Sequence, residues 1–323
     1  MADELFDRLD RAIDAVVTRG DATAALRDPE LATLVRIAAD LRHYPGTDFK
    51  ARLRAHLERR PTMSTAVLTS IREGFTTVTP YVWVADRGFA DFLVRVFDAV
   101  ETRVTEGGRH GTHRELRIGN SMLMLGEGAP DEIVPGRSMV FHVFVDDVDA
   151  VYAKALAAGG ESLGEPADRP YGERSGYIKD AYGNQWYIAS PLGPESFAHA
   201  VRTVTPYLHA HDVRAFIAFL VRAFGASEEV VHELPGGMIP YARVRVGDAA
   251  IELGTADPTP GALCLYVADP DVVYEQAVAA GAKALAPPAD QPSGDRMAFI
   301  EDTVGNQWYI TRPARRYGSA RPV

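Results

Sequence analysis

Apolar positions recur along the chain with two different spacings. Over residues 1–60 they return every three or four positions, as at Leu5, Leu9 and Ile13, which is the spacing of amphipathic helices. From Thr77 onward many stretches alternate with the two-residue period of a strand, and single helical stretches separate them. The pattern predicts a small helical unit followed by mixed α and β structure.

One order of elements recurs after residue 76. A strand leads into a helix, and three short strands follow, the last two joined by a tight turn at Gly119-Asn120. The same order then starts again three more times, which predicts four modules that each read strand, helix, strand, strand, strand (βαβββ). The predicted helices open at Asp86, Asp147, Asp212 and Asp269.

A larger repeat underlies the modules. The run Gly-Asn-Gln-Trp-Tyr-Ile occupies residues 183–188 and again 305–310, and residues 77–81 match residues 203–207. Matches this far apart indicate the tandem duplication of a whole domain of two modules. The predicted organisation is a helical unit at 1–60, a linker at 61–75, a first domain at 76–191, a linker at 192–201, a second domain at 202–313 and a tail at 314–323.

Charge and cysteine content restrict the partners. The 34 basic and 44 acidic side chains give a net charge of −10, which argues against nucleic acid and against an anionic membrane surface. The basic face of the helix near Arg52 and Arg59 is interpreted as a solvated face, and the helical unit is expected to dock on the domains or on a protein partner. A single cysteine, Cys264, excludes an internal disulfide, and no signal peptide or membrane span is predicted. We expect a soluble cytoplasmic protein.

The repeats resemble the vicinal oxygen chelate superfamily, in the branch of the glyoxalase, bleomycin-resistance and PhnB-like proteins. The resemblance implies an α+β fold with two tandem domains, each of two βαβββ modules that form a cupped sheet with the site inside the cup. The sequence leaves open which cup is active and whether each cup forms within one repeat or across both. The resemblance rests on residues 204–208, 219–226, 143–149, 288–291 and 294–296, and on the two Asp-x-x-Gly-Asn-Gln-Trp hairpins.

The resemblance also implies where a metal would bind. In metal-dependent relatives each module supplies one ligand from its first strand and one from its last. Of the eight corresponding positions here, only Glu252 has the expected residue type, so we expect no metal and no cofactor. An alternative keeps a metal, with His209 and His211 as displaced ligands beside Glu252. The eight positions are Thr79, Val140, Thr205 and Ala262 on first strands, and Met124, Tyr187, Glu252 and Tyr309 on last strands.

Strand alternation predicts which side chains line the cups. The set from the first repeat is more aromatic and suits a flat or apolar ligand, whereas the set from the second is more polar and suits a charged one. Trp186 and Trp308 fall on the opposite side of their strands and are predicted as core. The first set is Thr79, Tyr81, Trp83, His113, Glu115, Met122, Met124, His142, Phe144, Gln185 and Tyr187; the second is Thr205, Tyr207, His209, Tyr241, Arg243, Ala250, Glu252, Cys264, Tyr266, Gln307 and Tyr309.

Three classes of function fit these residues. The first is a metal-free small-molecule binding protein, like the bleomycin-resistance proteins, that holds an aromatic or amphipathic metabolite or antibiotic. The second is an enzyme, either a glyoxalase-like lyase or isomerase or an acid–base catalyst that uses Glu252 and His209. The third is a ligand sensor that acts through the N-terminal helices. In each case the expected partner is a small molecule, and the protein is expected to be a monomer, by internal pairing of its domains, or a weak homodimer.

Overall fold

The computed structural model describes residues 71, 74–108, 111–128, 138–193 and 201–314. The helical unit predicted at residues 1–60 and the tail after residue 314 lie outside the described residues, as does most of both linkers. Within the described part of the chain, no helix has the length and apolar character needed to cross a membrane.

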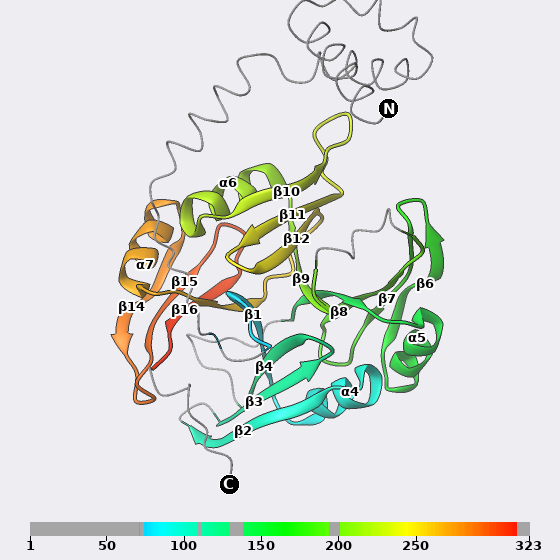
Figure 1. Cartoon of the computed structure of the whole chain (residues 1–323), viewed down its shortest axis with the longest axis horizontal. Coiled ribbons are helices and arrows are strands. Elements are labelled where there is room, and N and C mark those ends of the chain that lie inside the picture. Colours follow the sequence, from blue (N-terminus) through cyan, green and yellow to red (C-terminus); the bar gives the residue numbers. More distant parts are fainter. Residues whose placement is uncertain (1–70, 72–73, 109–110, 129–137, 194–200, 315–323) are drawn as a thin grey trace, which may run out of the picture. The chain divides into compact units, whose positions relative to one another are not determined.

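The described residues form the four predicted βαβββ modules (Figure 1). Module 1 contains β1 (Val78–Val84), α4 (Gly88–Phe97), β2 (Val100–Gly108), β3 (Gly111–Ile118) and β4 (Ser121–Glu127). Module 2 contains β5 (Val140–Phe144), α5 (Val148–Ala157), β6 (Glu161–Arg169), β7 (Glu173–Lys179) and β8 (Gln185–Pro191). Module 3 contains β9 (Val204–Ala210), α6 (Val213–Phe224), β10 (Ser227–His232), β11 (Tyr241–Val246) and β12 (Ala249–Thr255). Module 4 contains β13 (Ala262–Tyr266), α7 (Pro270–Ala279), β14 (Lys283–Asp290), β15 (Arg296–Glu301) and β16 (Gln307–Arg312).

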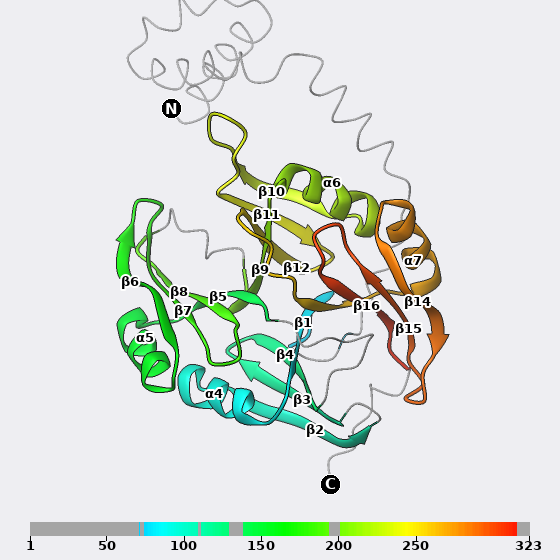
Figure 2. The same ribbon diagram turned by 180° about the vertical axis from the view of Figure 1, so that it is seen from behind.

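The modules pair across the repeats and not within them. One eight-stranded sheet has the order β14-β15-β16-β13-β1-β4-β3-β2, and the other has the order β10-β11-β12-β9-β5-β8-β7-β6. Modules 1 and 4 therefore share a sheet, joined by antiparallel β1 and β13, and modules 2 and 3 share the other, joined by antiparallel β5 and β9 (Figures 1 and 2). We call the concave face of the first sheet cup A and that of the second cup B. The lining residues predicted by repeat are thus redistributed, because each repeat supplies one module to each cup.

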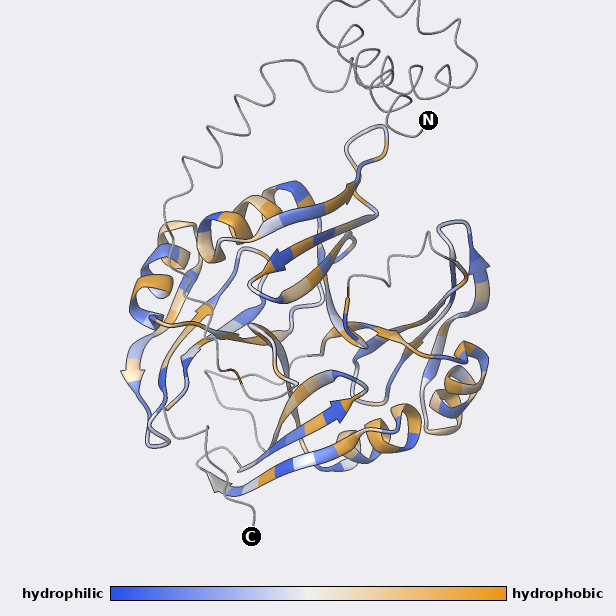
Figure 3. Ribbon diagram, in the orientation of Figure 1, coloured by the Kyte–Doolittle hydropathy of each residue, from blue (hydrophilic) through white to orange (hydrophobic). Residues whose placement is uncertain are grey.

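Aspartates begin the helices as the sequence predicts. Asp147, Asp212 and Asp269 are N-caps whose carboxylates accept hydrogen bonds from backbone N–H groups of the first turn. Asp86 differs, because α4 begins only at Gly88 and the Asp86 carboxylate accepts the N–H of Gly88 at 2.8 Å. The helices then bury an apolar stripe, as on α6 with Phe216, against the faces of the sheets that turn away from the cups (Figure 3).

The repeated hairpin motif is organised around a buried carboxylate. Asp302 Oδ1 accepts the backbone N–H groups of Val304 (3.0 Å) and Asn306 (2.9 Å). Its Oδ2 accepts the Asn306 side-chain amide (2.9 Å) and the indole N–H of Trp308 (2.8 Å). Asp180 makes the equivalent bonds in the first repeat, to residues 182, 184 and 186. Both tryptophans are fully buried, which confirms their predicted place in the core.

Two hydrogen bonds, at equivalent positions of the two repeats, join the two sheets. The Asn120 side chain accepts the N–H of Thr203 at 2.8 Å, and the Asp248 side chain accepts the N–H of Thr77 at 2.7 Å. Each threonine lies just before the first strand of a repeat and contacts the last hairpin of a module in the other sheet. The glycines of these hairpins have positive φ, and a Cβ on Gly119 or Gly247 would lie 2.2 Å from the facing threonine oxygen, so neither position accepts a side chain without movement.

Candidate functional site

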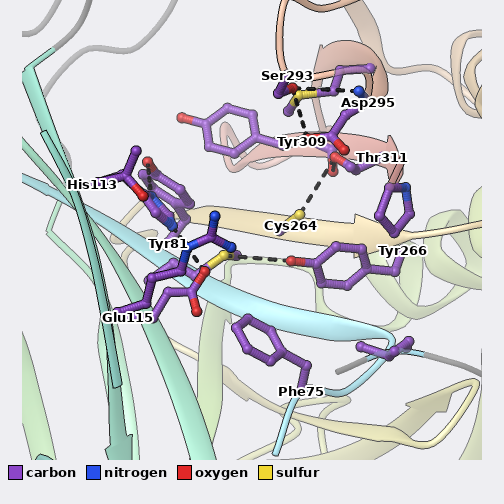
Figure 4. Close-up of a pocket in the computed structure, with 16 residues that line it drawn as sticks. Phe75, Tyr81, His113, Glu115, Cys264, Tyr266, Ser293, Asp295, Tyr309 and Thr311 are labelled. Carbon is purple, nitrogen blue, oxygen red and sulfur yellow. Dashed lines mark hydrogen bonds and ion pairs between the residues drawn. The ribbon is translucent and has the colours of Figure 1, made fainter. Parts of the chain in front are cut away.

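Cup A encloses a cavity of about 360 Å³ (Figure 4). Its aromatic and sulfur-bearing side chains include Phe75, Tyr81, Met124, Cys264, Tyr266, Met297 and Tyr309. Module 1 supplies Tyr81 and Met124, and module 4 supplies Cys264, Tyr266, Met297 and Tyr309, so the cavity exists only because modules of different repeats pair. Its size lies within the range of small-molecule pockets.

One wall of cup A carries a short chain of polar contacts. Tyr81 Oη lies 3.0 Å from His113 Nδ1, and His113 Nε2 lies 3.4 Å from Glu115 Oε1. Burial, assisted by nearby Tyr309, raises the pKa of Tyr81, so its phenol stays protonated. Burial also raises the pKa of Cys264 to about 11, and its Sγ lies 3.5 Å from Thr311 Oγ1. Cys264 is therefore a protonated packing residue near neutral pH and a poor nucleophile.

Cup B encloses a cavity of about 420 Å³ whose walls are rich in tyrosine. The rings contact one another, as where Tyr187 lies 5.2 Å from Tyr207 and 4.5 Å from Tyr177 between ring centroids. The cavity is lined by five tyrosines, Tyr171, Tyr177, Tyr187, Tyr207 and Tyr241, and by His142, Glu173, Ser175, His232 and Pro240.

The base of cup B contains a buried histidine between two carboxylates. His142 Nδ1 lies 2.8 Å from Glu252 Oε2, and His142 Nε2 lies 3.7 Å from Glu173 Oε2. Tyr241 donates to the other oxygen of Glu252 at 2.8 Å. Burial alone would lower the pKa of His142, but attraction to Glu252, with a smaller contribution from Glu173, raises it. Both oxygens of Glu252, which is fully buried, are thus occupied, and His142 and Glu173 are the groups that face the cavity.

The family's metal positions do not form a metal site. In cup A they hold Thr79, Met124, Ala262 and Tyr309, and in cup B they hold Val140, Tyr187, Thr205 and Glu252. Alanine and valine have no donor atom, and the one carboxylate, Glu252, is bonded to His142 and Tyr241. Among the described residues, no group of three or more His, Cys, Asp or Glu side chains could hold a metal ion. The residues present therefore do not fit the metal that the fold family implies.

The predicted pair Glu252 and His209 has separate partners in cup B. His209 Nε2 lies 3.5 Å from Tyr187 Oη, and burial lowers its pKa, whereas Glu252 bonds His142 and Tyr241. His211 follows the end of β9, is exposed and lies 3.8 Å from Asp257. The two histidines therefore do not converge with Glu252, and His142 occupies the place next to this carboxylate.

Most predicted ligand-binding residues lie at the cavity walls, although each cavity combines residues from both repeats. Thr79, Trp83, Thr205, Arg243 and Gln307 are not among the lining residues. Trp83 donates to the Tyr309 hydroxyl at 3.2 Å, Arg243 donates to Glu229 at 2.9 Å, and Gln307 Oε1 is buried without a hydrogen-bond partner among the described residues. Those at the walls are Tyr81, His113, Glu115, Met124, Tyr266 and Tyr309 in cup A, and His142, Tyr187, Tyr207 and Tyr241 in cup B.

The third strand of each C-terminal module supplies lining residues that were not predicted. Glu173, Ser175 and Tyr177 on β7 line cup B, and Met297 on β15 lines cup A. The signal was present in the sequence, because residues 173, 175 and 177 follow the two-residue period that places side chains on one face of a strand.

Paired βαβββ modules that enclose a cup on each mixed sheet define the vicinal oxygen chelate class of fold. The family model for the Glyoxalase/Bleomycin resistance protein/Dioxygenase superfamily matches residues 87–188 and 197–310, and the chain belongs to this superfamily.

The relatives span from mycobacteria to plants. An uncharacterised Mycobacterium tuberculosis protein is 32% identical over 151 residues, which cover 43% of this chain and 84% of that protein. A Mycobacterium bovis protein, CFP32, whose name assigns it provisionally to the glyoxylases, is 27% identical over 195 residues, which cover 58% of this chain and 73% of that protein. Among solved structures, glyoxalase I from Zea mays has a TM-score of 0.55 at 17% identity, over 73% of this chain and 92% of the maize chain. At that identity the likeness establishes the fold alone.

Proposed function

We propose that the chain binds small aromatic or amphipathic molecules in its cups and does so without a resident metal. Binding of this kind requires a shaped cavity that is partly apolar and carries a few polar anchors. Both cavities meet this description, with volumes of about 360 Å³ in cup A, whose wall mixes aromatic, sulfur-bearing and polar side chains, and about 420 Å³ in cup B, whose wall is rich in tyrosine. The resemblance to bleomycin-resistance proteins supports the same proposal.

The composition of the metal positions carries the proposal. Glyoxalase-type chemistry depends on a metal that stabilises developing charge on the substrate, and such a metal takes about three protein ligands. Cup A offers no His or carboxylate at its four positions, and cup B offers only Glu252, whose two oxygens bond His142 and Tyr241. This chain is therefore similar to CFP32, which is named as a glyoxylase, but it lacks the metal ligands that glyoxalase-type chemistry requires.

Acid–base catalysis in cup B is the second candidate, favoured by one specific observation. His142 faces the cavity while its other ring nitrogen lies 2.8 Å from buried Glu252. A carboxylate in that position fixes the orientation of the imidazole and stabilises its protonated form. In this candidate His142 exchanges a proton with the ligand. Glu252 orients the imidazole of His142 and does not itself exchange a proton with the ligand. The sensor candidate depends on residues 1–60, outside the described part of the chain, and stays a prediction.

Thermal-shift screening with aromatic natural products, combined with elemental analysis of the purified protein, tests the proposal. A ligand should raise the unfolding temperature, and Tyr81→Ala or Tyr207→Ala should abolish the shift for a ligand of cup A or cup B respectively. Tyr274→Ala, on α7 and outside both cavities, should leave it unchanged. Treatment with a chelator should alter neither the unfolding temperature nor the ligand shift. Near-stoichiometric zinc, nickel or iron that is lost in Glu252→Ala would overturn the metal-free proposal.

A further inference from the structure

Two side chains that line cup A come from outside the βαβββ modules. Ile71 and Phe75 lie on the chain before β1, and both form part of the cavity wall (Figure 4). We call the described residues Ile71, Gly74 and Phe75 the connector, because the chain passes through them into the first strand of module 1. The wall of cup A therefore includes the segment by which the modules are joined to the N-terminal part of the chain.

Phe75 completes an apolar cluster on the concave face of the sheet. Its side chain is buried, and its ring meets that of Tyr266 edge-on, with 6.2 Å between centroids. Ile71 packs against the same cluster. The other buried members all lie on strands of modules 1 and 4 and are Met122, Met124, Ala262, Cys264, Tyr266 and Tyr309. The cluster thus joins the strands of two modules to a segment that belongs to neither.

The backbone of the connector is held close to the sheet. Gly74 has a φ of +83°, and a Cβ at this position would lie 3.0 Å from the Met122 side chain on β4. Glycine is therefore required here both for the left-handed backbone conformation and for the close approach to β4. Arg202, which precedes β9, donates to the Gly74 carbonyl oxygen at 3.4 Å. These contacts support the backbone next to Phe75, the residue that reaches the cavity.

The second repeat offers an equivalent position with different surroundings. Because residues 77–81 match residues 203–207, Phe75 corresponds to Val201. Val201 is half-buried and is not among the described residues that line cup B. It has the same place before the first strand of a repeat, without a place in a cavity wall, and so provides a matched control for Phe75.

We propose that cup A holds the aromatic part of its ligand between the sheet and the connector, so that ligand binding and packing of the connector stabilise each other. This proposal rests on the proposed binding function and adds a means of regulating one cup. Phe75 from the connector and Met124 and Tyr266 from the strands line one cavity of about 360 Å³, so a molecule that fills it contacts both sides. Such coupling is reciprocal, because the ligand favours the packed connector by the factor with which the packed connector favours the ligand.

Fluorescence titration with N-phenyl-1-naphthylamine, an uncharged aromatic probe, tests the contact with Phe75. The titrations are made in the full chain carrying Tyr207→Ala, which removes binding to cup B, so that they report cup A alone. Adding Phe75→Ala should weaken binding about tenfold, because the probe loses an aromatic wall. Adding Phe75→Leu, which keeps an apolar side chain in the cluster, should cost only part of that affinity. Adding Val201→Ala should leave the affinity unchanged.

Hydrogen exchange of the unaltered full chain tests the coupling and needs no variant. With free probe at ten times its dissociation constant for cup A, the amides of residues 74–76 should exchange more slowly by as much as about elevenfold, if the probe binds only while the connector is packed. The turn at residues 158–160 follows α5 on the other sheet and lies outside both cavities. Its amides should exchange at an unchanged rate.

The outcomes separate this proposal from the proposed function. Equal effects of Phe75→Ala and Val201→Ala, or unchanged exchange at residues 74–76, would overturn the role of the connector while small-molecule binding stood. Equal slowing at residues 74–76 and 158–160 would show a general effect of the probe and would also overturn it. So would a failure of the probe to bind in Tyr207→Ala while the unaltered protein binds it or another aromatic compound. If no aromatic compound bound or shifted the unfolding temperature, the binding function would fail together with this proposal.

Discussion

Replacing Asp302 by Asn tests what the twice-occurring hairpin motif contributes to stability. The wild-type carboxylate accepts four hydrogen bonds, two at each oxygen. In the variant one oxygen becomes an amide nitrogen, which cannot accept. If the remaining oxygen keeps the two backbone N–H groups, the new nitrogen faces the Asn306 amide and the indole N–H of Trp308, so that donors face donors in a buried place.

The expected loss follows from these two bonds. Each hydrogen bond to a charged acceptor contributes about 1.5–3 kcal/mol, so losing two costs roughly 3–6 kcal/mol. Part of the loss is recovered, because burial raises the pKa of Asp302, which shows that the site penalises the charge that the variant removes. We therefore expect a net loss of about 3 kcal/mol in the free energy of unfolding, or a fall of roughly 6–12 °C in the unfolding temperature.

Urea unfolding followed by circular dichroism measures the loss. The transition midpoint should fall while its slope stays the same, because the substitution changes stability without changing the surface exposed on unfolding. A double-mutant cycle with Trp308→Phe isolates the shared bond. The double variant should lose about 1–2 kcal/mol less than the sum of the single variants, since each single change already breaks the contact between Asp302 and Trp308. Asp180→Asn, the same change in the first repeat, should cost a similar amount.

Three results would refute this reasoning. A loss below about 1 kcal/mol in Asp302→Asn would mean that the carboxylate does not organise the turn. Additive losses in the cycle would mean that the bond to Trp308 contributes little. A large difference between Asp180→Asn and Asp302→Asn would mean that the same motif contributes different amounts to stability in the two repeats, even though both carboxylates accept hydrogen bonds from the equivalent groups.

Two further predictions concern charge and module pairing. Because Glu252 and Glu173 raise the pKa of His142 in the folded protein, its protonated form contributes stability that is complete below the unfolded value, about pH 6.5, and is lost as pH rises through the folded pKa. His142→Gln should therefore cost more unfolding free energy at acidic than at alkaline pH in urea titrations, and an equal cost at both would contradict this. Cutting the chain at a protease site inserted between residues 193 and 201 should leave both fragments together in gel filtration, because β1 pairs with β13 and β5 with β9 across the repeats; separation without denaturant would disprove that pairing.

The features that could be predicted from sequence are those with a local cause. Strand alternation, the capping aspartates and the duplicated hairpin each act over a few residues, so the four modules and the buried places of Trp186 and Trp308 follow from the sequence. The exception is Asp86, because α4 begins two residues after it, whereas each of the other three helices begins directly after its aspartate.

The pairing of the modules has no local cause. It depends on contacts such as Asn120 with Thr203 and Thr77 with Asp248, which join distant parts of the chain. The contact between His142 and Glu252 could not be predicted from sequence for the same reason. The two residues belong to different repeats, and they meet only because modules 2 and 3 share a sheet. His209, which lies on the same repeat as Glu252, was therefore the more visible partner in the sequence. Glu173 was missed for another reason, since strand alternation was not followed onto β7.

Because the modules pair across the repeats, the two cups can share one arrangement of strands and still carry different residues at the bottom of each cup. Modules 1 and 3 are copies of each other, as are modules 2 and 4, and each sheet contains one module of each kind. Each cup is therefore a complete copy of the other, related by an internal two-fold symmetry. In a homodimer of identical domains both cups would carry the same residues. In one chain a change in module 2 and another in module 3 meet in cup B, as His142 and Glu252 do, while Cys264 and Met124 remain together in cup A. The duplication thus allows one cup to acquire a buried ion pair without imposing its desolvation cost on the other.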